Sequence, residues 1–111
     1  MKGRIFIIRT NMLDLSHIER RDMDRPPTRE EWQAACEGYI QLVPGLSRCR
    51  PLIGSPDKCI ALCNEDGDRL RLPVNPLATA LWHGSAPEFS TQRLVGNVMV
   101  LTGDAEFMAS L

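Results

Sequence analysis

The sequence predicts a single α+β domain: a mixed or antiparallel sheet of about four or five strands, one face of which is covered by the main helix (residues 28–38), plus a short second helix (residues 76–82). Two observations support this fold class. Short runs rich in β-branched and aromatic residues recur between turns rich in glycine and proline, whereas residues 28–38 carry a full set of helix signals. With 111 residues, 43% of them apolar, the chain is large enough for one core, so residues 1–111 are expected to form one domain.

The first part of the chain is expected to form a strand followed by a polar connection. Residues 3–9, "GRIFIIR", are rich in isoleucine and flanked by charge, which predicts a central strand. Residues 10–27 are irregular and polar and end in two prolines. Their run "ERRDMDR" mixes both signs of charge, so we expect a solvated connection or a short helix there.

The main helix is predicted over residues 28–38, "TREEWQAACEG". Thr28 is placed to cap its N-terminus, and Glu31 follows at the spacing of a capping box. Gly38 is expected to end the helix in the left-handed conformation. The apolar face of this helix consists of Trp32, Ala35 and Cys36.

Two more strands are expected in the middle of the chain. Residues 39–43, "YIQLV", directly follow the main helix and are typical of a short strand. Residues 58–64, "KCIALCN", have apolar side chains on both faces, which indicates a strand buried between two layers. Residues 44–56 contain three prolines and two glycines and therefore predict a loop, with an extended segment at "RCRPLI".

The next segment is expected to combine a turn, a strand and the short helix. "EDGD" predicts a turn, and "RLRL", residues 69–72, alternates like the return strand of a hairpin. Asn75 is placed as a helix cap and Pro76 at the favoured first position, so a helix is predicted over residues 76–82.

The remaining residues are expected to form a loop, a strand and a terminal element. Residues 83–92 predict the loop, and residues 93–103, "RLVGNVMVLTG", predict the last strand. Gly96 within it indicates a bulge or a close approach of another part of the backbone. "DAEFMASL" is expected to form a terminal turn or helix.

The net charge and the length of the apolar runs argue against several classes of function. Thirteen basic and fourteen acidic residues give a net charge of −1, so the chain lacks both the basic excess of a nucleic-acid-binding protein and the acidic excess of a DNA mimic. No apolar run approaches the ~18 residues of a membrane span, and "IFII" is too short for a signal peptide. We expect a cytoplasmic protein with reduced cysteines that binds neither membranes nor nucleic acid directly.

Neither a metal site nor a cofactor is expected. If Gly67 took the sixth position of an EF-hand calcium loop, Leu62 would occupy the first ligand position. Only one pair of cysteines is closely spaced and both histidines are isolated, so no zinc cluster is predicted. Cys49 lies between two arginines that would favour its thiolate, but we favour an unreactive exposed loop thiol there. An enzyme that uses Cys49 or His83 is therefore the third of three functional hypotheses.

A candidate anion-binding site lies at the predicted second helix. Free backbone N–H groups at helix N-termini bind anions, and Asn75 and Thr79 could flank such a site while Arg71 adds charge. The alternative is that Asn75 only caps the helix and Thr79 packs or faces water. We favour this alternative.

Four motifs occur in an order that resembles a known group of proteins. They are Gly-Tyr-Ile-x-x-Val at 38–43, Asn-Glu-x-Gly at 64–67, Leu-Pro-x-Asn-x-x-Ala-Thr at 72–79 and Val-Gly-x-x-x-Val at 95–100. In this order they resemble a family of short, uncharacterised domains borne largely by phages and plasmids. The resemblance spans about residues 30–103 and implies no catalytic residue. The polar segment after the first strand and the loop "RCRPLIGSPDK" depart from the pattern.

This resemblance implies a small accessory protein of a mobile genetic element. Such proteins often bind host machinery, and anti-CRISPR proteins and nucleotide sponges are commonly of this size. The leading hypothesis is an inhibitor that binds a host defence protein and blocks it sterically. The second is a small-molecule or nucleotide-binding sponge or regulator that uses the helix N-terminus at Asn75.

The contact surface of an inhibitor is expected in the loops that the motifs do not cover, since binding usually resides in loops on a rigid scaffold. These segments are residues 10–27, 44–57 and 83–92. The candidate partner-binding residues are Arg20, Arg21, Arg48 and Arg50. Exposed edge strands would also allow a homo-oligomer.

Overall fold

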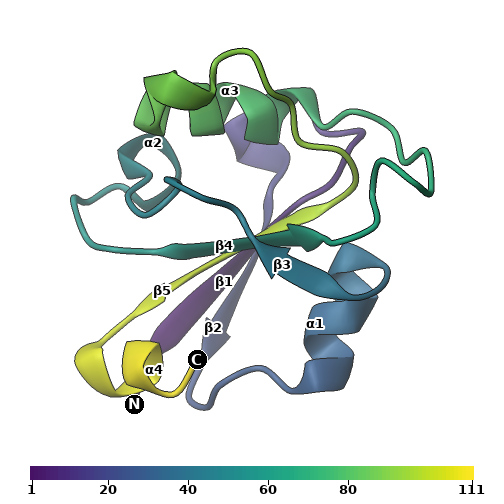
Figure 1. Ribbon diagram of the computed structural model, residues 1–111. Helices are drawn as coiled ribbons and strands as arrows, with labels where there is room; N and C mark the ends of the chain where they lie inside the picture. The colour runs from purple at the N-terminus through teal and green to yellow at the C-terminus, as the bar shows by residue number, and fades with distance from the viewer.

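A five-stranded antiparallel sheet forms the centre of the protein, which we describe from a computed structural model covering residues 1–111 (Figure 1). The strands lie in the order β2-β1-β5-β4-β3. Their bounds are β1 Gly3–Ile8, β2 Glu19–Met23, β3 Ile40–Leu42, β4 Ile60–Asn64 and β5 Val98–Gly103. The helices are α1 Arg29–Cys36, α2 Arg50–Ile53, α3 Pro76–Ser85 and α4 Ala105–Ala109, and short 3-10 turns occur at Leu15–His17 and Pro87–Phe89. The predicted α+β class is confirmed.

Both faces of the sheet are covered by helices, so the fold has three layers. In Figure 1, α2 and α3 lie on one side of the sheet and α1 and α4 lie on the other. Side chains alternate along each strand, so the two central strands supply both cores. Phe6, Ile8, Val98 and Val100 face α2 and α3, and Ile5, Ile7, Met99 and Leu101 face α1 and α4. None of these eight side chains is more than 2% exposed. The prediction that β4 lies buried between layers is confirmed as well.

The charged run after β1 is a strand, not the solvated connection or short helix that we expected. Glu19–Met23 form β2, which pairs with β1 at the edge of the sheet. Charged side chains are common on edge strands, because they discourage pairing with other chains. Across this pair Arg4 lies opposite Asp22, and the Arg4 Nε and the Asp22 Oδ1 are 3.0 Å apart.

The predicted return strand at residues 69–72 is also wrong. This part of the chain forms a series of turns, and β4 pairs with β3 and β5 instead. Arg71 has a φ of 54°, which a strand does not allow. Gly67 is buried so close to Val95 that a Cβ atom would lie 2.6 Å from the Val95 side chain. The chain therefore folds back over Val95 instead of continuing along the sheet.

The predicted extended segment at "RCRPLI" forms the short helix α2, and α3 continues three residues beyond the predicted end at residue 82. Gly54 ends α2 in the left-handed conformation, with a φ of 83°. Gly96 does mark a close approach, since a Cβ atom there would lie 2.8 Å from the Leu72 side chain.

The capping box of α1 forms as predicted, but the helix ends earlier. The Thr28 Oγ1 accepts the N–H of Glu31, and the Glu31 carboxylate accepts the N–H of Thr28. Glu37, not Gly38, takes the left-handed conformation, with a φ of 62°. The Asn97 Nδ2 donates to the Glu37 Oε1 at 3.0 Å, and this bond anchors the side chain of the strained residue.

We expect Glu31 to make the free energy of unfolding depend on pH. A hydrogen bond from Arg25 and the N–H of Thr28 lower the pKa of Glu31 from 4.5 to about 2. A carboxyl whose pKa is lower in the folded state stabilises the fold above its unfolded pKa, and this contribution is lost as the pH falls toward the folded pKa. The urea midpoint should therefore fall between about pH 5 and pH 2, and Glu31→Gln should reduce this fall.

The matched control is Glu30→Gln, in the same helical turn, whose carboxylate has no ion-pair partner. It should leave the pH profile as in the wild type. Identical profiles for Glu31→Gln and Glu30→Gln would contradict the assignment.

Candidate binding surface

Two of the three segments expected to contact a partner lie against each other on the side of the sheet covered by α2 and α3. The Ser85 Oγ donates to the carbonyl of Arg48 at 2.5 Å, which joins residues 83–92 to residues 44–57. Just beside this bond, the Trp82 Nε1 donates to the carbonyl of Pro44 at 2.7 Å. The Trp82 ring also stacks on Phe89, with 4.9 Å between the ring centroids.

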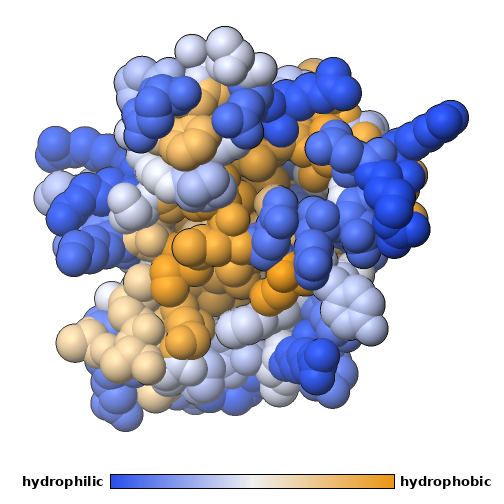
Figure 2. Space-filling model, in the orientation of Figure 1, coloured by the Kyte–Doolittle hydropathy of each residue, from blue (hydrophilic) through white to orange (hydrophobic).

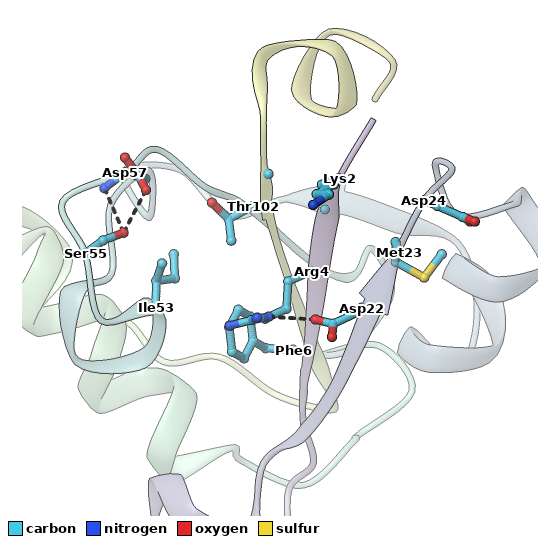
Figure 3. A pocket seen from close by; sticks show the side chains of 12 residues that line it. Lys2, Arg4, Phe6, Asp22, Met23, Asp24, Ile53, Ser55, Asp57 and Thr102 are labelled. Carbon is cyan, nitrogen blue, oxygen red and sulfur yellow. Dashed lines mark hydrogen bonds and ion pairs between the residues drawn. The ribbon is translucent and has the colours of Figure 1, made fainter.

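The third segment, residues 10–27, meets residues 44–57 across a cavity of about 740 Å³ (Figure 3). Phe6 and Ile53 are its apolar lining residues, together with Met23 at the end of β2. The charged residues that line it are Lys2, Arg4, Asp22, Asp24 and Asp57. The cavity thus combines a small apolar patch of three residues with a charged rim, and it is formed by β1, β2, β5, α2 and the connection from α2 to β4.

Several polar groups around this cavity hydrogen-bond to one another. Arg4 pairs with Asp22, and the Ser55 Oγ donates to the Asp57 Oδ2 at 2.9 Å (Figure 3). The Thr102 Oγ1 donates to the carbonyl of Lys58 at 2.9 Å and so ties β5 to the start of β4. The cavity lining contains no histidine or cysteine.

The structure separates two of the four candidate arginines. Arg20 and Arg21 are neighbours in β2, so their side chains point to opposite faces of the sheet. The guanidinium of Arg20 lies 5.8 Å from the centroid of the Phe6 ring, on the side of the cavity. Arg21 lies opposite Ile5 on the other face, where it pairs with Glu19 at 2.8 Å. Of these two arginines, only Arg20 therefore lies on the side of the cavity.

Arg48 and Arg50 both lie on the α2 side and both are exposed. Arg48 donates to the carbonyl of Pro56 at 2.7 Å, which holds the ends of the α2 connection together. Arg50 is the first residue of α2, and its guanidinium has no ion-pair or hydrogen-bond partner in the protein. We define the candidate binding surface as Arg20, Arg48, Arg50 and Ile53; Phe6 lines the cavity beside them but is only 1% exposed.

The candidate anion site at the start of α3 does not form an open site. Asn75 is fully buried; its Nδ2 donates to the carbonyls of Ile8 and Gly96, and its Oδ1 accepts the N–H of Ala78. All of its polar atoms are thus used inside the fold. Thr79 exchanges hydrogen bonds with the backbone of Leu94 through its hydroxyl, and Arg71 is exposed in the turn before the helix.

The expectation that Cys49 is an exposed loop thiol is wrong, since its side chain is only 2% exposed. Burial raises the pKa of Cys49 and raises those of Cys36 and Cys59 to about 12 and about 11. The neighbouring arginines do not offset the effect of burial on Cys49, and the guanidinium of Arg48 donates instead to the carbonyl of Pro56. The Nε2 of His83 lies 2.6 Å from the carbonyl of Gln92. No group of three or more histidine, cysteine or acidic residues is arranged to hold a metal ion.

The cavity itself was not anticipated from the sequence. The alternation of β1 places Arg4 and Phe6 on one face, which is a local signal. Their partners Asp22 and Ile53 come from distant segments, and nothing local specifies that they meet.

Comparison with known proteins assigns no relative: no protein-family model, curated protein or solved structure matches the chain. None of its helices has both the length and the apolar character to cross a bilayer.

Proposed function

We propose that the protein is an accessory protein of a mobile genetic element that inhibits a host defence system by binding a host protein and blocking it sterically. One observation supports this proposal above all others. The four motifs leave three segments uncovered, and these segments converge on the α2 side of the sheet. They are residues 10–27, 44–57 and 83–92. Binding residues are typically carried by such loops on a rigid scaffold.

The chemistry of this surface fits contact with another protein. An apolar depression surrounded by charge is the pattern of an interface in which one large side chain of the partner fills a pocket and the polar rim excludes water. Arg48 and Arg50 beside the depression would favour acidic residues on the partner, since complementary charge steers association and fixes its register. The partner we propose is therefore a host protein that presents an apolar side chain to the cavity and acidic residues to Arg48 and Arg50. The aspartates on the rim of the cavity would instead favour basic residues beside that side chain.

The double substitution Arg48→Glu and Arg50→Glu is expected to abolish inhibition without unfolding the protein. Both side chains are exposed, and the only bond lost within the protein is the surface hydrogen bond from Arg48 to the carbonyl of Pro56, so the free energy of unfolding should fall by only about 1 kcal/mol. Like charges facing each other across an interface cost several kcal/mol, so binding should weaken by about 100-fold or more. The measurement is affinity purification of the tagged protein from its bacterial host, followed by native mass spectrometry of the eluate.

The matched control is Arg29→Glu, an exposed arginine on α1, on the other side of the sheet. It should retrieve the host protein as well as the wild type does. If the double variant retrieves the same host protein in the same yield, the α2 connection is not the interface. If the wild type retrieves no host protein, the proposed function itself is wrong.

A further inference from the structure

The free edge of β3 leaves backbone groups without partners. The carbonyl of Tyr39 and the N–H of Val43 both bond to the chain of β4 or its flanking residues, at 2.8 Å. In an antiparallel pair alternate residues point toward the partner strand, so the N–H and C=O groups of Ile40 and Leu42 point away from β4. They have no partner elsewhere in the protein, and Figure 1 shows no element beyond β3.

The side chains on this edge differ from those on the opposite edge. β2 carries four charged residues in succession, Glu19–Asp22, whereas Ile40–Leu42 carry none. Leu42 is 61% exposed and Tyr39 is 62% exposed. In Figure 2, which views the molecule from the β3 side, apolar side chains form a band across the middle of this face. An uncharged, apolar edge strand is a template for pairing with another strand.

The pattern of this edge is complementary to itself. A two-fold axis at Gln41 places Ile40 opposite Leu42 of a second copy, and Leu42 opposite Ile40. Each outward N–H then meets an outward C=O, and each apolar side chain meets another apolar side chain on the α1 side of the sheet. Pairing centred on Ile40 would place Leu42 opposite Gly38, and pairing centred on Leu42 would use Pro44, which has no N–H to donate.

We propose that two copies of the protein pair through β3, antiparallel and in register about Gln41, to form a homodimer with one continuous ten-stranded sheet. The self-complementary pattern of outward N–H and C=O groups supports a second copy as the occupant, and the paired segment carries no charged side chain that would oppose it. The cavity next to β2 lies at the other end of the sheet, so the dimer leaves it open. A test of the dimer therefore does not depend on whether the proposed host partner binds.

The first test is the mass of the purified protein in solution. Light scattering and native mass spectrometry at micromolar concentrations should give twice the 12.5 kDa of one chain. Leu42→Lys should raise the dissociation constant of the dimer at least about tenfold, because it removes an apolar cross-strand contact and introduces a charge at the edge. Leu13→Lys is the matched control, since Leu13 is 88% exposed and lies away from β3. It should leave the dimer intact.

The second test reports the register and does not depend on Leu42→Lys folding. On the axis, Gln41 of each copy occupies a pair without mutual hydrogen bonds, where side chains approach most closely. Gln41→Cys should therefore form an intermolecular disulfide under mild oxidation, whereas Leu42→Cys, which faces Ile40 of the other copy, should not. Both variants carry Cys63→Ser, because Cys63 lies directly opposite Gln41 on β4 and could form an intramolecular disulfide with the new thiol; the other three native cysteines are buried. A monomer at all concentrations, a dimer that Leu42→Lys leaves unchanged, or equal cross-linking of both cysteine variants would overturn the proposal.

Discussion

Asn75→Asp is expected to destabilise the protein by about 3–5 kcal/mol, far more than the loss of a helix cap. Aspartate caps helices as well as asparagine does, so a residue that only capped α3 would tolerate this change. In the structure, the Asn75 amide also donates to the carbonyls of Ile8 and Gly96, at 2.8 and 3.0 Å. A carboxylate there would face two carbonyl oxygens in a site with no exposure to solvent.

Urea unfolding at pH 7, followed by tryptophan fluorescence, measures this effect. Asn75→Ala should cost a similar amount, because it leaves two buried carbonyls and the N–H of Ala78 without partners. Asn11→Ala, at an exposed asparagine without hydrogen bonds in the fold, is the control and should stay within about 0.5 kcal/mol of the wild type. A neutral Asn75→Asp would show that the two donated bonds contribute little and that Asn75 acts only as a cap.

Trp82→Ala is expected to lower the free energy of unfolding by about 3–5 kcal/mol and to weaken binding of the proposed host partner as well. Trp82 is 3% exposed, its ring stacks on Phe89, and its Nε1 donates to the carbonyl of Pro44. Its loss would empty the space between α3 and the connection that carries Arg48. The binding surface should therefore lose order along with the core.

The other tryptophan provides the matched comparison. The Trp32 Nε1 is buried and has no hydrogen-bond partner, so Trp32→Phe removes a donor that the fold does not satisfy. Its effect should lie within about 0.5 kcal/mol of zero, whereas Trp82→Phe should cost about 1–2 kcal/mol by leaving the carbonyl of Pro44 unpaired. Equal costs for the two phenylalanine variants would show that the bond to Pro44 does not stabilise the fold.

Local patterns in the sequence predicted the helices and strands that form because of residues close together in the chain. The capping box of α1 and the apolar runs of β1, β4 and β5 depend on residues within a few positions of one another, and these elements form, although β5 begins at Val98 and not at the predicted residue 93. β2 was missed because its strand conformation depends on pairing with β1 and not on an apolar pattern of its own. The alternation of residues 69–72 was misleading, because the packing of Gly67 against Val95 turns the chain away from the sheet.

The candidate site was harder to predict from the sequence, because its residues are brought together by contacts between distant segments. Four arginines were predicted as contacts, and three of them lie on the α2 side: Arg20, Arg48 and Arg50. Arg21 lies on the opposite face, because it follows Arg20 in strand β2, which the sequence did not predict, and side chains alternate between the two faces of a strand. Asn75 was recognised as a cap from its neighbour Pro76. Its bonds to Ile8 and Gly96 span 67 and 21 residues, and no local pattern records contacts over such separations.

The order of the strands has a consequence for how the chain folds during synthesis. The two central strands, β1 and β5, pair Gly3 with Gly103 and come from distant parts of the chain. Before β5 has been synthesised, β1 can pair only with the charged edge strand β2. The two cores are then incomplete, because each of them contains side chains of β5. Contacts over such long sequence separations also slow folding, since the loop must close before they form. The apolar side chains of Ile5 to Ile8 therefore stay without their final partners until Val98–Gly103 have been synthesised.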